Sequence, residues 1–221
     1  MEVVYRWNQG DVSSDDMRKN LVPPRESQVE PFLEMIEKVW VDTYTAEVGQ
    51  QTLRSYIPKQ ILLVGSASYN DDGSTTEGTA EGGRQIVLYS VNDFNFTLEQ
   101  IQSYAHVMHH EFAHILHQNV EYDAEFEKIT PSYSSSWMQM NDETARTKGF
   151  ITAYASSSAD EDFAEMVSIM LTNSPEDWDN MIESAGNATA VEALRKKEAI
   201  VVAYMKNNWG VDMKDFQKEV V

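Results

Sequence analysis

The stretch Met108–His117 constrains this chain more than any other part of its sequence. It contains His110, Glu111 and His114 in the pattern H-E-x-x-H. On an α-helix, residues i and i+4 lie one above the other on the same face, so the two imidazoles can bind one metal ion with Glu111 beside it. Two neutral imidazoles, a third protein ligand and an open position make a catalytic zinc site. The sequence therefore predicts bound Zn²⁺, provided that the stretch is helical.

The segment around the motif has the pattern of a helix. From Thr97 to Gln118 the chain has no Gly or Pro, and Thr97 followed by Glu99 and Gln100 is typical of a capped helix start. Apolar residues recur at helical spacing and form one face, made by Ile101, Tyr104, Ala105, Met108, Phe112, Ile115 and Leu116. The alternative is a histidine-rich, partly exposed helix without a metal. The helical context favours the metal site.

Composition bounds the class of protein. A chain of 221 residues, 42% of them hydrophobic, is long enough for one well-packed domain. We expect a single domain over residues 1–221, with a β-containing part at 1–95 and a helical part at 96–221. The formal charge of −19 argues against nucleic acid as a partner. The chain has no cysteine, which excludes disulfides and thiolate zinc ligands.

Hydrophobic patterns place the other elements. Aliphatic runs at Ile61–Val64 and Ile86–Val91 predict strands, with a Gly-rich surface loop between them, and Val29–Val48 predicts a long helix. Residues 8–28 have the polar composition of a loop or linker. Further helices are expected at 138–147, Ala159–Leu171, 175–184, 188–206 and 212–219.

The third zinc ligand is best sought on the helix expected at Ala159–Leu171. His117 is about 10.5 Å of helix rise from His110, too far for both to bind one ion. Glu161 and Glu165 stand at i and i+4, and a carboxylate pair on an otherwise apolar helix is costly unless it is paired or binds metal. Acidic residues also favour a helix N-terminus through its dipole, which explains the first turn but not Glu165. We expect Glu161 as the ligand, with Glu165 accepting a hydrogen bond from a ligand histidine.

These two motifs resemble those of the gluzincin branch of zincin metallopeptidases. In that branch a helix glutamate is the third ligand and an acidic residue four positions later orients a ligand histidine. The segment from Tyr154 to Glu165 also resembles the site of the lethal-factor-like toxins. That resemblance implies that Tyr154, seven residues before Glu161, polarises the substrate carbonyl. The alternative for Tyr154 is a place in an aromatic cluster with Phe150.

A longer resemblance is to the zinc-binding metallopeptidase lipoproteins of Bacteroidetes, which accompany outer-membrane nutrient-import systems. It rests on HHEFAHILHQ, on GFITAYASSSADEDFAE at 149–165 and on GTAEGGRQIVLYSVNDF at 78–94. The resemblance implies an exported lipoprotein of the cell envelope or surface and an outer-membrane import complex as partner. The leader and the lipid-anchor cysteine are not in this chain.

Together these observations predict an α+β, zincin-like metallopeptidase domain that hydrolyses a peptide bond. Glu111 would take a proton from the attacking water, and Tyr154 would donate to the developing oxyanion. The peptide or protein substrate is expected along Gln85–Val91, as on an edge strand. Two alternatives remain: a zinc-bound, non-catalytic component of an import complex, and a hydrolase of non-peptide amides.

Overall fold

The computed structural model describes residues 1–8, 19–70 and 73–220, and consists mostly of helices with a small sheet. Its internal contacts divide the chain into two compact units. Unit 1 comprises 1–42 and 51–118, and unit 2 comprises 43–50 and 119–221. The single domain expected over residues 1–221, with its parts at 1–95 and 96–221, stays a prediction; in the division into units, the helix that carries the histidines groups with the strands. Each unit is described by itself.

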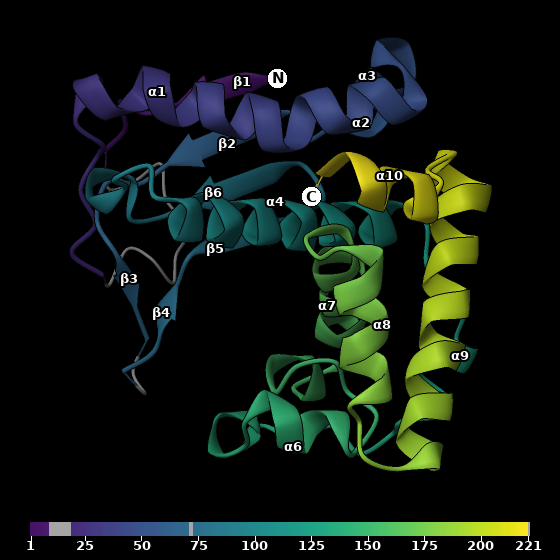
Figure 1. Cartoon of the computed structure of the whole chain (residues 1–221). Helices are drawn as coiled ribbons and strands as arrows, with labels where there is room; N and C mark the ends of the chain where they lie inside the picture. The colour runs from purple at the N-terminus through teal and green to yellow at the C-terminus, as the bar shows by residue number, and fades with distance from the viewer. Residues whose placement is uncertain (9–18, 71–72, 221) are drawn as a thin grey trace. The chain divides into compact units, whose positions relative to one another are not determined.

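Unit 1 is built on a four-stranded sheet in the order β1-β2-β6-β5 (Figure 1). Its strands are β1 (Glu2–Val4), β2 (Gln60–Leu63), β5 (Gly78–Glu81) and β6 (Gln85–Leu88). β6 pairs in parallel with β2 and antiparallel with β5. The expectation that Gln85–Val91 forms an edge strand is therefore wrong, since both edges of β6 are occupied. The edge on that side of the sheet is β5.

The connection between the two predicted strands is not the plain loop that we expected. It contains a two-stranded antiparallel sheet of β3 (Ser68–Tyr69) and β4 (Thr75–Thr76), followed by β5. Gly-Thr-Ala-Glu has no apolar alternation, and it is a strand because β6 supplies its pairing partner. The linker predicted at 8–28 lies partly outside the described residues, and its last residues, from Glu26 onward, already belong to a helix.

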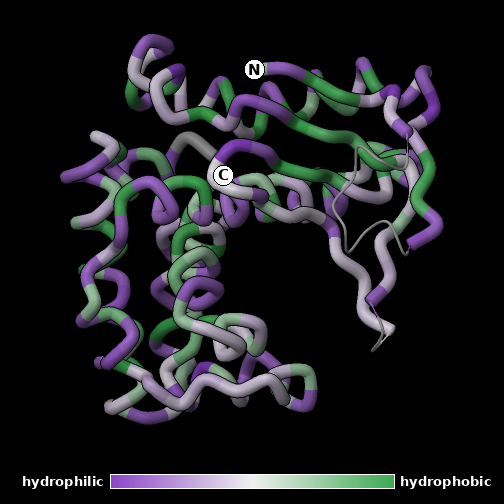
Figure 2. The backbone as a smooth tube through the Cα atoms, turned by 180° about the vertical axis from the view of Figure 1, so that it is seen from behind, coloured by the Kyte–Doolittle hydropathy of each residue, from purple (hydrophilic) through white to green (hydrophobic). Residues whose placement is uncertain are grey.

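The two longest helices of unit 1 lie on one face of its sheet (Figure 1). The expected long helix is present as α1 (Glu26–Ile36) and a π-helical turn η3 (Glu37–Asp42), and it continues into α2 (Thr43–Val48) of unit 2. The others are α3 (Gln50–Tyr56), a short η4 (Val91–Asp93) and α4 (Leu98–Asn119). Figure 1 shows α1 and α4 in front of the strands, and Figure 2 shows the same strands from behind.

Aromatic contacts and a hydrogen bond fix α4 within unit 1. The rings of Phe32 of α1, Phe94 and Tyr104 of α4 pack edge to face with centroids 5.0–5.2 Å apart. The hydroxyl of Tyr104 donates to the carbonyl of Tyr89, just after β6, at 2.5 Å. On the sheet, Trp7 packs with Leu21, Leu62, Val64, Val87 and Tyr89 in one buried cluster. The helix that carries the histidines is thus anchored to the sheet.

Unit 2 is helical in its described residues. Its longer helices are α7 (Ala159–Leu171), α8 (Pro175–Glu183) and α9 (Ala188–Tyr204), which continues as η7 (Met205–Trp209). The shorter ones are α5 (Glu125–Ile129), η5 (Trp137–Gln139), α6 (Asp142–Arg146), η6 (Tyr154–Ser156) and α10 (Met213–Val220). These positions confirm the predicted helices within a few residues.

The core of unit 2 surrounds α7, which packs against α8, α9 and α10 (Figure 1). Phe163 of α7 stacks on Tyr122 at 4.4 Å and meets Tyr204 of α9 edge to face at 5.0 Å. Side-chain caps explain where the helices begin: Ser158 accepts from the backbone N–H of Glu161. Of the helices that the structure describes, none combines the length and apolar character needed to cross a membrane.

Candidate metal centre

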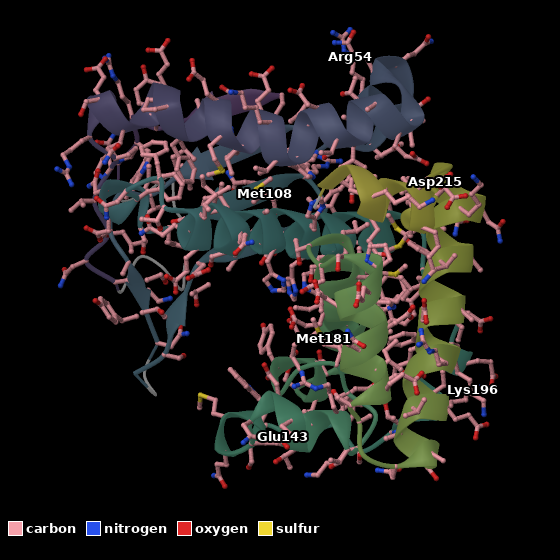
Figure 3. All side chains as sticks on the ribbon, in the orientation of Figure 1. Arg54, Met108, Glu143, Met181, Lys196 and Asp215 are labelled. Atoms are coloured by element: carbon pink, nitrogen blue, oxygen red, sulfur yellow. The ribbon has the colours of Figure 1, made fainter. Side chains whose placement is uncertain are left out.

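The H-E-x-x-H motif lies on the second half of α4, as predicted. The hydroxyl of Thr97 accepts from the N–H of Gln100 at 3.3 Å, which confirms the expected cap. Met108, labelled on α4 in Figure 3, is fully buried on the apolar face. Because successive residues turn by about 100°, His110 points to a different side of the helix. Both His110 and Glu111 are nevertheless largely buried, at 6% and 7% exposure.

The two motif imidazoles face each other. Nε2 of His110 and Nε2 of His114 are 3.1 Å apart, and the ring centroids are separated by 4.7 Å. Two nitrogens at 2.0–2.1 Å from one tetrahedral zinc ion would be about 3.4 Å apart. The pair therefore fits zinc in both donor type and spacing. Both nitrogens belong to side chains of α4.

The other three histidines of α4 lie near the motif pair. Nδ1 of His114 lies 2.8 Å from Nε2 of His117, so His117 holds the second nitrogen of a predicted ligand. The ring of His106 lies 5.9 Å from that of His110. His109 is fully buried, and burial, together with His106, lowers its pKa to about 3, which keeps it neutral.

Strand β5 passes directly beside the predicted general base. A Cβ on Gly78 would lie 2.5 Å from Cγ1 of Val107 and 3.4 Å from Cγ of Glu111, so only glycine allows this approach. Just before the strand, Glu77 accepts a hydrogen bond from the hydroxyl of Ser103 at 2.7 Å. The edge of the sheet is thereby held against the part of α4 that carries Glu111. No sequence pattern pointed to this strand.

In unit 2, α7 presents the two predicted glutamates in different surroundings. Glu161 is half-buried in the first turn, where the Ser158 hydroxyl accepts from its N–H at 3.3 Å. Glu165 is 3% exposed, and its Oε2 accepts from the hydroxyl of Thr152 at 2.6 Å. The helix dipole accounts for acidic residues in the first turn, but not for a buried carboxylate one turn later. Thr152 is a partner that the sequence did not reveal.

Asp162, next to Glu161 on α7, forms a buried ion pair with Lys197. Its Oδ2 accepts from Nζ of Lys197 at 2.5 Å and from the hydroxyl of Tyr133 at 3.1 Å, and both charged side chains are fully buried. Burial raises the pKa of Asp162 to about 6 and lowers that of Lys197, while their contact opposes both shifts. The same Nζ donates to the carbonyl of Gly149 at 2.8 Å.

Tyr154 lies on the turn η6 and is 37% exposed. Its ring meets that of Trp137 edge to face, with centroids 4.9 Å apart. Phe150, proposed as its alternative partner, packs on Tyr133 at 5.4 Å instead. The aromatic cluster considered for Tyr154 therefore has a different partner from the one expected, and Tyr154 keeps a substantial exposed surface.

Comparisons with known proteins place the chain in a family. Residues 1–214 match the family described as "Putative zinc-binding metallo-peptidase". A crystal structure of a putative zinc-binding metallo-peptidase from Bacteroides caccae is 34% identical, covers 100% of this chain and 84% of that one, and superposes with a TM-score of 0.79. No curated protein matches the chain. Zinc is thus the family's metal, in agreement with the imidazole pair of α4, and the chain belongs to this zinc-binding metallopeptidase family.

Proposed function

We propose that the chain is a zinc metallopeptidase of gluzincin type with a zincin-like fold. The observation that carries this proposal is the pair of Nε2 atoms of His110 and His114, 3.1 Å apart, with Glu111 on the same buried stretch of α4. Glu161 is the third ligand in this proposal. Its support is its place in the capped first turn of α7 and the resemblance of that helix to the gluzincin pattern.

Each side chain has one task in the proposed reaction. Bound zinc would supply a Lewis acid that acidifies water and polarises the scissile carbonyl. Glu111 takes a proton from the attacking water and returns it to the leaving amine. Tyr154 donates its hydroxyl proton in a hydrogen bond to the oxyanion. Glu165 accepts a hydrogen bond from Thr152 through Oε2, and in this proposal its carboxylate also orients a ligand histidine.

Strand β5 supports a peptide as the substrate. One edge of β5 pairs with β6, and no strand among the described residues pairs with the other. An extended peptide can add to such an edge through main-chain hydrogen bonds. Because Gly78 brings this strand against Glu111, a peptide on β5 would pass the general base. This observation favours a peptidase over a hydrolase of non-peptide amides.

The proposal is tested with zinc content and hydrolysis measured on the same preparations. We expect about one zinc per chain and chelator-sensitive cleavage of a diverse peptide library. Glu111→Gln should keep the zinc but lower turnover about 10²–10⁴-fold, because the general base is lost. Glu99→Gln, an exposed change in the first turn of the same helix, is the matched control. Zinc binding with no hydrolysis of any peptide would instead support a non-catalytic accessory role in an import complex.

A further inference from the structure

The hydroxyl of Thr152 joins the turn that carries Tyr154 to the carboxylate of Glu165. Thr152 Oγ1 accepts from the N–H of Ala155 at 3.0 Å, inside the turn η6. The same oxygen donates to Oε2 of Glu165 at 2.6 Å. Thr152 is half-buried and Glu165 is almost fully buried.

The direction of both bonds follows from the chemistry of the groups. A backbone N–H only donates, so the threonine oxygen must accept from Ala155. Its single proton is then available for Glu165, and an ionised carboxylate only accepts. At 2.6 Å this is a short hydrogen bond between two oxygen atoms.

The rest of the turn is held by other segments. The N–H of Ala153 donates to the carboxylate of Asp142 at 2.8 Å, and the carbonyl of Ser156 accepts from the N–H of Ser134 at 2.8 Å. These bonds tie the turn to α6 and to the loop before η5. The Thr152 hydroxyl adds a direct bond to α7. A shift of either the turn or the Glu165 carboxylate therefore disturbs a hydrogen bond of the same Thr152 oxygen.

We propose that Thr152 is a positioning residue that couples the Tyr154 turn to the Glu165 carboxylate. The proposal rests on the function proposed above, in which Glu165 orients a ligand histidine and Tyr154 serves the oxyanion. Thr152 touches neither metal nor substrate in this scheme. It acts through Glu165 on metal affinity and through the turn on turnover.

The test compares Thr152→Val, which keeps the shape and removes the hydroxyl, with Thr152→Ser, which keeps the hydroxyl. Thr152→Val should weaken zinc binding about tenfold, near the low end for outer contacts of a metal site, and lower kcat with little change in KM. Thr152→Ser should have zinc affinity and kcat close to those of the wild type. The matched control is Thr172→Val, because the Thr172 hydroxyl donates to the carbonyl of Ser168 at 2.7 Å at the other end of α7. It should leave zinc affinity and kcat unchanged.

A double-mutant cycle separates positioning from general loss of structure. Once Glu165→Ala has removed the carboxylate, Thr152→Val should cause no further loss of zinc affinity. An equal loss in both backgrounds would overturn the proposal, as would wild-type zinc affinity and kcat in Thr152→Val. Unfolding in the presence of chelator checks each variant. Should Thr152→Val prove unfolded, Thr152→Ala removes the same hydroxyl and is judged by the same outcomes.

The outcomes also separate this inference from the proposed function. If Glu161→Ala leaves zinc binding unchanged, the ligand set is wrong and the proposed function fails. If Glu161→Ala abolishes tight binding and Glu165→Ala weakens it, while Thr152→Val changes neither affinity nor kcat, only the role of Thr152 is refuted.

Discussion

Replacement of Lys197 by methionine should be among the most destabilising single changes in unit 2. Lys197 is fully buried on α9, whereas the preceding Lys196, labelled in Figure 3, is exposed. Its Nζ donates to Asp162 and to the carbonyl of Gly149, and lies 4.3 Å from the ring centre of Phe150. One ammonium group thus joins α9, α7 and the segment that leads to Tyr154.

The size of the effect follows from what methionine leaves behind. Methionine is close to lysine in length, so little volume is lost, but the cation is removed. The fully buried Asp162 then keeps the Tyr133 hydroxyl, at 3.1 Å, and loses its counter-ion. Removing one partner of a buried ion pair costs about 3–5 kcal/mol, because the remaining charge is uncompensated. We expect the free energy of unfolding to fall by about that amount at pH 7.

The penalty should depend on pH with a defined sign. The pKa of Asp162 is raised by burial from 3.8 in the reference state to about 6 in the folded chain. A raised carboxyl pKa contributes stability that is present below the unfolded value and is lost as the pH rises through the folded value. Without Lys197 the pKa of Asp162 should rise further, since the opposing contact is gone. The penalty of Lys197→Met should therefore shrink as the pH falls from about 7 to about 5.

The assay is urea unfolding of the full chain in chelator, so that metal binding does not contribute. Lys196→Met is the matched control, because Lys196 forms an exposed ion pair with Glu192. Adding Asp162→Asn to Lys197→Met should recover much of the loss, since no buried charge then lacks a partner. A penalty below about 1 kcal/mol at pH 7, or one that is constant between about pH 5 and 7, would refute the reasoning.

Three further predictions concern the proposed site and its strand. Glu161→Ala should abolish tight zinc binding and Glu165→Ala should weaken it about 10–100-fold; the reverse order in a zinc titration would make Glu165 the ligand. Tyr154→Phe should lower turnover about 10²–10³-fold with zinc content and unfolding unchanged, whereas lost stability with normal turnover would make Tyr154 structural. Gly78→Ala should destabilise the chain by about 1–3 kcal/mol, because its Cβ meets Cγ1 of Val107, and the penalty should be smaller in a Val107→Ala background; an equal penalty in both backgrounds would contradict this.

The sequence was most informative where one local pattern decides the structure. The bounds predicted for α7 match those observed, because Ser158 caps the helix and the apolar residues repeat at helical spacing up to Leu171. The spacing of His110 and His114 likewise fixes their common face, since i and i+4 are neighbours on any helix. In both cases the determining interactions lie within a few residues of each other.

Long-range pairing was the part that the sequence did not reveal. β5 has no strand pattern of its own and depends on β6, so the edge of the sheet was assigned to the wrong segment. The hydroxyl of Thr152 gave no signal, because a single threonine in a loop has many partners available. Lys197 did give a signal in the sequence. One buried stripe of α9 contains Leu194, Lys197, Val201 and Tyr204. A lysine in such a stripe predicts a buried acidic partner.

Different long-range contacts hold different parts of the stretch 149–165, so mutations in them should have different effects. Lys197 holds its beginning at Gly149 and the first turn of α7 at Asp162, both through a buried charge. Thr152 holds the middle through a hydroxyl on Glu165, where no buried charge loses its counter-ion on mutation. Loss of Lys197 should therefore lower stability more than it changes the site, whereas loss of the Thr152 hydroxyl should leave a folded chain with a displaced carboxylate and turn. When both quantities are measured on the two variants, Lys197→Met should lower stability more than zinc affinity, and Thr152→Val should lower zinc affinity more than stability.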